Sequence, residues 1–290
     1  MSEQQDPKNK RKGNVELISR IISALVLAAL ALFADYLGGA LFSAFWVGAA
    51  VLVFYEWLGL VGVRGRNKVS IFLLGVAALS ISAYLAHDEL DTLNRIYVPV
   101  IGALVGIIIL SRRSLRQSLW SCAGLIYSSV LVVSLIALRG NSTEGFLAIL
   151  WLFGVVWAAD IGAFFVGRSL GGPKLWPSIS PKKTWSGFIG GIFLGAGAGF
   201  LVATIGQELL SVVWFQGVEV FVFSLGGALI SQAGDLFESS LKRRFHQKDS
   251  GHLIPGHGGI MDRLDSFVAA AFYAFLMVYV FGLAPLGYFM

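Results

Sequence analysis

Cysteine is almost absent from this chain, which contains one, Cys122, inside an apolar stretch. A single cysteine cannot form a disulfide within the chain, so chemistry based on a cysteine pair is excluded. The expected role of Cys122 is that of a small buried apolar side chain.

Charged residues are also scarce, at 13% of 290 residues, whereas hydrophobic residues reach 56% and the mean hydropathy is +0.75. Such a composition predicts an integral membrane protein rather than a soluble domain. No small-x-small cleavage site ends the first apolar stretch, so we interpret it as a retained span and not as a signal peptide. A helix needs about 20 apolar residues to cross the hydrocarbon core. We therefore predict an all-α, polytopic bundle of about nine transmembrane helices, over residues 17–34, 40–60, 69–86, 96–110, 119–138, 146–167, 187–206, 212–236 and 264–288.

The basic residues, which raise the pI to 9.4, are distributed unevenly between the predicted loops. If the N-terminus is cytoplasmic, Arg95 and Arg139 are the only two of the 22 basic residues that face the other side. The positive-inside rule favours this orientation. Because topology and anionic lipid headgroups explain the basic pI, nucleic acid is not expected as a partner.

One polar stretch, residues 232–266, lies between two strongly apolar blocks. Carboxylates at both of its ends could share a hard cation, and lysines and arginines between them suit a polyphosphate. Glycines beside the turn allow backbone N–H groups to approach phosphate oxygens. The acidic residues of this stretch are Asp235, Glu238, Asp249, Asp262 and Asp265, and the basic ones are Lys242, Arg243, Arg244, Lys248 and Arg263.

Histidines in the same stretch raise the question of zinc. His246, His252 and His257 lack the usual pairing with cysteine or at i+4, and hard carboxylates dominate their surroundings. Magnesium is therefore the preferred metal, with room for a second cation.

Other ionisable residues lie within the apolar segments. Asp160 precedes Arg168 by about two turns, and it is either a site carboxylate or a partner in a structural hydrogen bond or ion pair. Asp35 and Glu56 lie near span ends, where solvation at the membrane interface is the expected state. Nothing else in the first five spans indicates chemistry, so we expect a scaffold there, with the contact of a homodimer.

The loop between the sixth and seventh predicted spans is basic and rich in proline. Pro173, Pro177 and Pro181 limit its freedom, which favours a shaped anion site. The following span has Gly191, Gly195 and Gly199 at intervals of four, a spacing that lets helix backbones approach closely. These glycines indicate helix packing, although the partner helix is not readable from the spacing.

The residues from Ser240 to Asp265, S-L-K-R-x4-K-D-x-G-x2-I-P-G-H-G-G-x-M-D-R-x-D, resemble the signature of the phosphatidate cytidylyltransferases. Most of these positions are specified, so the pattern is highly specific. A second block, SPKKTWSG from Ser180 to Gly187, is similar to the family's other cytosolic motif. It departs from that motif at Ser186, where Glu or Gln is expected, so no carboxylate role is assigned there. The resemblance covers the C-terminal half, whereas residues 1–140 match in hydropathy alone.

The resemblance implies transfer of CMP from CTP to phosphatidate, which yields CDP-diacylglycerol and pyrophosphate. It implies Mg²⁺ as cofactor, and CTP, phosphatidate and membrane lipids as partners, at the cytoplasmic side of a bacterial inner membrane. The expected metal ligands are Asp235, Asp262, Asp265 and Asp160. The expected catalytic residues are Asp235, Asp262, Asp265, Lys242 and Arg263. The expected substrate-binding residues are Ser180, Lys182, Lys183, Thr184, Arg243, Lys248, Asp249, His257, Gly258 and Gly259.

On this interpretation, the chain consists of a polar tail (1–14), a transmembrane scaffold (15–140) and a catalytic region (141–290) with cytosolic loops at 168–186 and 239–263. Two alternatives stay open. A transporter or channel would explain Asp160 and the glycine-rich helix, but it explains poorly why most polar residues fall in loops. A cytidylyltransferase for an isoprenoid glycerol phosphate would use the same signature.

Overall fold

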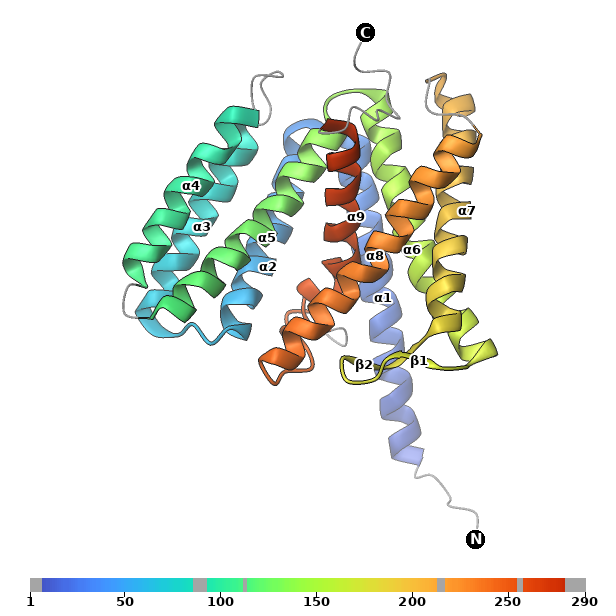
Figure 1. Ribbon diagram of the computed structural model, residues 1–290, viewed down its shortest axis with the longest axis horizontal. Coiled ribbons are helices and arrows are strands. Elements are labelled where there is room, and N and C mark those ends of the chain that lie inside the picture. Colours follow the sequence, from blue (N-terminus) through green and yellow to red (C-terminus); the bar gives the residue numbers. More distant parts are fainter. Residues whose placement is uncertain (1–6, 86–92, 112–113, 213–216, 255–257, 280–290) are drawn as a thin grey trace.

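Long apolar helices make up most of the computed structural model, which describes residues 7–85, 93–111, 114–212, 217–254 and 258–279 (Figure 1). Two short strands lie between the sixth and seventh helices. The elements are α1 (Pro7–Leu37), α2 (Gly39–Leu60), α3 (Gly65–Leu85), α4 (Leu93–Leu110), α5 (Leu115–Arg139), α6 (Thr143–Leu170), β1 (Lys174–Trp176), β2 (Ser180–Thr184), α7 (Trp185–Leu210), α8 (Val218–Arg244) and α9 (Met261–Tyr279).

Six of these helices are long and apolar enough to cross a membrane, namely α2, α3, α5, α6, α7 and α8. Shorter apolar stretches occur in α1 (Ile22–Leu37) and α4 (Tyr97–Leu110), and α9 has 19 residues. The prediction of an all-α membrane protein is therefore confirmed. The finer count of nine transmembrane helices stays a prediction.

Short polar side chains mark where three of the helices begin. Ser114, Ser142 and Thr184 each accept a hydrogen bond from the backbone N–H three residues further on, at the starts of α5, α6 and α7. Such caps satisfy N–H groups that have no partner inside the helix. The local sequence thus determines where these helices start after each turn.

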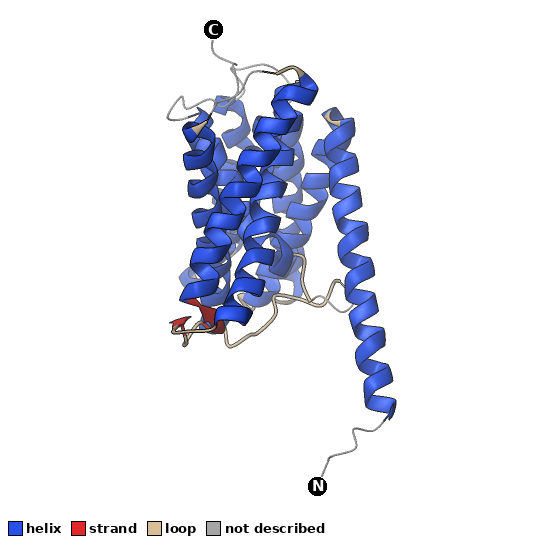
Figure 2. Ribbon diagram, turned by 90° about the vertical axis from the view of Figure 1, so that its right-hand side faces the viewer, coloured by secondary structure: helices blue, strands red, loops and turns tan. Residues whose placement is uncertain are grey.

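Successive helices run in opposite directions, so the hairpin lies at the same end of the bundle as the α8–α9 loop (Figure 1). Helix α9 packs between α5 and α8, while α3 and α4 form a flanking pair. Helix α1 lies at the edge of the bundle and extends beyond it (Figure 2). Stacked rings of Trp46, Phe153 and Phe267 join α2, α6 and α9 in the core, with centroids 5.0–6.4 Å apart.

The glycines of α7 face α6 of the same chain. A Cβ at Gly191 would lie 2.7 Å from the carbonyl oxygen of Ala159, and one at Gly195 would lie 2.9 Å from that of Val155. Neither position has room for a side chain, because the two backbones are in contact. The prediction that this glycine stripe serves helix packing is confirmed, and its partners are α6 and, through Gln232, Ala228 and Ser224, α8.

Asp35 is not solvated at the membrane interface, so that prediction was wrong. Its carboxylate lies 2.9 Å from Nε of Arg139, and both side chains are buried. Arg139 also donates to the carbonyl oxygens of Asp35, Gly140 and Ser142. A buried charge needs such partners, and this pair ties α1 to the turn between α5 and α6.

Candidate functional site

The basic, proline-rich block forms a small antiparallel hairpin rather than a loop without regular structure. Trp176 pairs with Ser180, and Lys174 pairs with Thr184. Ser186, the position that departs from the expected motif, donates a hydrogen bond to the carbonyl oxygen of Gly171 and so helps to close the base of the hairpin. The chain from Gly171 to Gly187 is therefore shaped by its own hydrogen bonds, as the prolines indicated.

Two contacts attach this hairpin to α8. Nζ of Lys183 lies 2.6 Å from a carboxylate oxygen of Asp235, whose other oxygen accepts a hydrogen bond from Ser239. Arg243 donates to the carbonyl oxygen of Ile179 at 3.2 Å. The structure thus brings together the two blocks that the sequence analysis selected, although they are about 50 residues apart along the chain.

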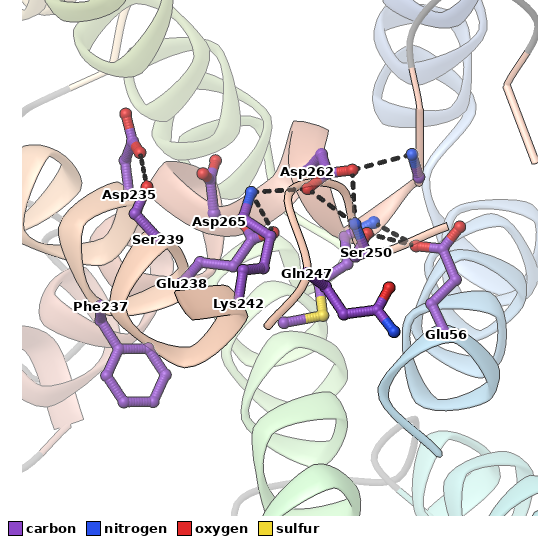
Figure 3. Close-up of polar contacts among 12 residues, drawn as sticks. Glu56, Asp235, Phe237, Glu238, Ser239, Lys242, Gln247, Ser250, Asp262 and Asp265 are labelled. Atoms are coloured by element: carbon purple, nitrogen blue, oxygen red, sulfur yellow. Dashed lines mark hydrogen bonds and ion pairs between the residues drawn. The ribbon is translucent and has the colours of Figure 1, made fainter. Parts of the chain in front are cut away.

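The C-terminal turns of α8 place Lys242 between two carboxylates. Its Nζ lies 2.7 Å from Asp262 and 3.2 Å from Glu238, which is fully buried (Figure 3). Helix α8 continues through this segment to Arg244. The reason is that 3.6-residue periodicity continues through this polar segment, with Glu238 and Leu241 buried on one face.

Asp262 holds the two ends of the loop that follows α8. Its oxygens accept hydrogen bonds from the backbone N–H groups of Ser250 and Gly259, at 3.0 and 2.9 Å. Asp262 lies in the polar first turn of α9, ahead of the apolar part of that helix. Burial acts to raise the pKa of its carboxyl, but hydrogen bonds, from Lys242 above all, outweigh burial and hold the pKa below its usual value. Asp262 is therefore an anion fixed by several donors.

Glu56 is part of this site, and the prediction that it is solvated at the interface was wrong. It is 3% exposed and accepts hydrogen bonds from Ser250 Oγ and from the backbone N–H groups of Ile260 and Met261, at 3.0, 3.1 and 2.9 Å. Figure 3 shows Glu56 and Lys242 approaching the loop from opposite sides of Asp262. This role was not predicted, although a lone carboxylate within an apolar segment often indicates a functional site.

Asp160 and Asp265 lie near the other acidic residues. Asp160, on α6, lies within electrostatic range of Asp265, Asp235 and Lys183. Asp265 accepts a hydrogen bond from the backbone N–H of Ser266 at 2.8 Å. The four predicted metal ligands thus come from three helices, α6, α8 and α9, at one region of the bundle.

The remaining predicted residues divide into exposed and structural ones. Thr184 is buried and caps α7, while Gly258 has a φ of +85° and Gly259 has no room for a Cβ beside Ser250 and Glu56. Ser180 lies half-buried at the start of β2. His257 is outside the described residues. The exposed members are Lys182, Arg243, Lys248, Asp249 and Arg263.

The acidic residues suit Mg²⁺ by chemical type, because it prefers carboxylate oxygens. One Glu238 oxygen, Oε2, has no hydrogen-bond partner among the described residues. Within those same residues, however, no three His, Cys, Asp or Glu side chains converge on one point. Instead, Lys183 forms an ion pair with Asp235, and Lys242 forms one with Asp262. The carboxylates fit a divalent cation by chemical type alone, and the ion pairs would have to open to admit one.

Comparison with known proteins identifies the class. Residues 18–281 match the model of the cytidylyltransferase family, so the chain belongs to that family. A relative named phosphatidate cytidylyltransferase, from Brucella suis biovar 1 (strain 1330), is 41% identical over 266 residues, which cover 92% of this chain and 93% of the relative. Relatives of the same name from Rickettsia bellii (strain RML369-C) and Bacillus subtilis (strain 168) are 43% and 40% identical over 51% and 54% of this chain, and cover 64% and 56% of theirs.

Proposed function

We propose that this protein is a phosphatidate cytidylyltransferase, which transfers CMP from CTP to phosphatidate and releases pyrophosphate. The observation that carries this function is the junction of the two signature blocks through Lys183 and Asp235. Membership of the cytidylyltransferase family and the shared name of the full-length relatives support the same activity. The glycine stripe that favoured a transporter is used for packing on α6, which removes that argument for transport.

The reaction joins two anions. An oxygen of the phosphatidate phosphomonoester attacks the α-phosphorus of CTP, and the bond to the β-phosphate breaks. The second pKa of a phosphomonoester is about 6, so the nucleophile is largely dianionic at neutral pH and needs no protein base. The protein must reduce the repulsion between the substrates and hold their phosphates in line.

Lysine and arginine side chains meet this requirement. Lys183 and Lys242 each lie beside a carboxylate at the hairpin end of the bundle, and Lys182, Arg243 and Lys248 are exposed in the same two segments of the chain. We assign these five side chains to the phosphates of the two substrates, since charged donors bind phosphate strongly. Arg263 is assigned to the same phosphates or to the orientation of Asp262.

Asp235, Asp262, Asp265 and Asp160 are the residues that would hold Mg²⁺. A bound divalent cation would supply positive charge for the pyrophosphate leaving group. Glu238, with its unpaired buried oxygen, is an additional donor beside Lys242. If the cation replaced Lys183 at Asp235, the ammonium group of Lys183 would be free to bind a phosphate.

The proposed setting is the cytoplasmic face of a bacterial inner membrane, with the chain as a homodimer. The positive-inside distribution of basic residues supports the orientation, because the hairpin and the chain from Lys242 to Arg263 carry many of them. Lipid tails would remain in the hydrocarbon layer while the phosphate reaches this end of the bundle.

The test is CDP-diacylglycerol formation by the purified chain in phosphatidate-containing micelles with Mg²⁺. We expect activity with CTP well above that with ATP, GTP or UTP, and with phosphatidate above an isoprenoid ether glycerol phosphate. Asp235→Asn should lower turnover by orders of magnitude, whereas Glu208→Gln, an exposed residue at the far end of α7, should not. Preference for the ether lipid would contradict the proposed substrate, and full Mg²⁺-dependent activity in Asp235→Asn would show that Asp235 is not a principal metal ligand.

A further inference from the structure

Glu56 in α2 lies far in sequence from both signature blocks but makes direct contact with one of them. Its carboxylate receives three hydrogen bonds, from the side chain of Ser250 and the backbone of Ile260 and Met261, over separations of 194 to 205 residues. We infer that Glu56 is a positioning residue for the proposed transfer reaction, because it fixes the α8–α9 loop and the start of α9 against α2. This inference rests on the proposed function.

The contacts require a carboxylate. Oε1 accepts from Ile260, and Oε2 accepts from both Ser250 and Met261. A glutamine has one acceptor oxygen and one donor group, so at least one backbone N–H would face another donor. An aspartate is one methylene shorter and would not reach all three donors. Buried donors left without a partner are costly, which makes the site specific for glutamate.

The loop is built around this carboxylate. A Cβ on Gly251 would lie 2.5 Å from Oε1, and one on Gly259 would collide with Oε2 and with Ser250. The backbone therefore approaches Glu56 as closely as glycine allows on both sides of the turn. Ile260 and Met261 also present N–H groups at the start of α9, where a negative charge is favourable.

Glu56 affects the site through the backbone groups that also hold Asp262. Three consecutive residues donate backbone hydrogen bonds to the two carboxylates. The N–H of Gly259 donates to Asp262, and those of Ile260 and Met261 donate to Glu56. Ser250 likewise donates its backbone N–H to Asp262 and its hydroxyl to Glu56. A change at Glu56 therefore moves the groups that hold Asp262 and, with it, Lys242. The exposed side chains of Lys248 and Asp249 precede Ser250 directly.

Steady-state kinetics of Glu56→Gln, Ser250→Ala and Glu208→Gln test this role. Misplacement of a site by about 1 Å can cost about 100-fold, so displacement of the loop predicts a rise in the KM for CTP of roughly 10- to 100-fold in Glu56→Gln. Ser250→Ala, which removes one of the three bonds, should give a smaller rise, and Glu208→Gln none. Partial unfolding would reduce the amount of active protein and leave KM unchanged.

Limited trypsin digestion of the same variants gives a readout that does not depend on activity. A loosened loop should be cut faster after Arg244 and Lys248 in Glu56→Gln than in wild type or Glu208→Gln, at unchanged cleavage elsewhere. An unchanged KM and digestion pattern in Glu56→Gln would overturn the inference, as would general destabilisation with an unchanged KM. An inactive wild-type protein would refute the proposed function instead, and digestion would still decide whether Glu56 holds the loop.

Discussion

At the scale of single residues, the site is held by pairs of opposite charge. Lys183 binds Asp235, and Lys242 binds Asp262, so these two predicted phosphate ligands each neutralise a predicted metal ligand. These side chains are at most 30% exposed, which limits screening by water and salt. On the proposed function, Asp235 and Asp262 would hold Mg²⁺, which would supply positive charge there, and Lys183 and Lys242 would bind the substrate phosphates.

Removal of Lys183 should therefore raise the KM for one of the substrates. A lost hydrogen bond to a charged group costs about 1.5–3 kcal/mol, so Lys183→Ala should raise the KM of one substrate roughly 10- to 150-fold. The activity should fall below about pH 6, where phosphatidate becomes a monoanion. Asp262, whose pKa is lowered, stays ionised there. Initial rates between about pH 5.5 and 9 should show this acid limb unmoved in Lys183→Ala.

A histidine variant is the control for the assignment of the acid limb to phosphatidate, because the unperturbed pKa of histidine lies near the same pH. His257→Gln should lower the rate through the geometry of the turn and keep the limb in place. A limb that disappears with His257 would identify a general base and refute the base-free mechanism.

At the scale of elements, α6 and α7 are held together by backbone contact. The carbonyl oxygens of Ala159 and Val155 lie against Gly191 and Gly195. This contact fixes the position of Thr184 and the hairpin at the start of α7, and that of Asp160 on α6. The packing of two helices therefore sets the distance between the hairpin and the carboxylates.

A methyl group at this contact should separate the helices. We expect Gly191→Ala to destabilise the protein by about 1–3 kcal/mol, the usual cost of overpacking. Gly197→Ala is the matched control, because its Cβ would meet nothing within 4 Å. Thermal unfolding in detergent micelles should distinguish the two variants, and equal melting temperatures would contradict the packing argument.

The helices and the residues of both signature blocks could be predicted because their signals are local. Apolar runs indicate spans, and Gly191, Gly195 and Gly199 indicate close packing at helical spacing. The partners could not be predicted, because Glu56 and Ser250 are 194 residues apart and Asp35 and Arg139 are 104 apart. The hairpin was not predicted because its strands, of three and five residues, are too short to show an alternating pattern of apolar and polar side chains.

At the scale of the whole molecule, the topology places the hairpin and the α8–α9 loop at one end of the bundle. Single cysteines at exposed Arg64 and Lys182, in a Cys122→Ser background, should react with an impermeant reagent only from the cytoplasm. A cysteine at exposed Asn141, in the α5–α6 turn, should react only from outside. Labelling of positions 141 and 182 from the same side would rule out the nine-span arrangement. The homodimer stays a prediction that crosslinking in native membranes would test.

The closure of the α8–α9 loop onto α2 also sets an order of events during biosynthesis. Domains assemble from the N-terminus as the chain is made, so α2 enters the membrane long before residues 250–261 leave the ribosome. Until then Glu56 has no partner from this loop, and Asp262, on the last helix, does not yet exist. Fragments that end before α9 therefore cannot complete the site. A truncated or stalled chain would therefore lack the proposed site, which forms only once α9 joins the bundle.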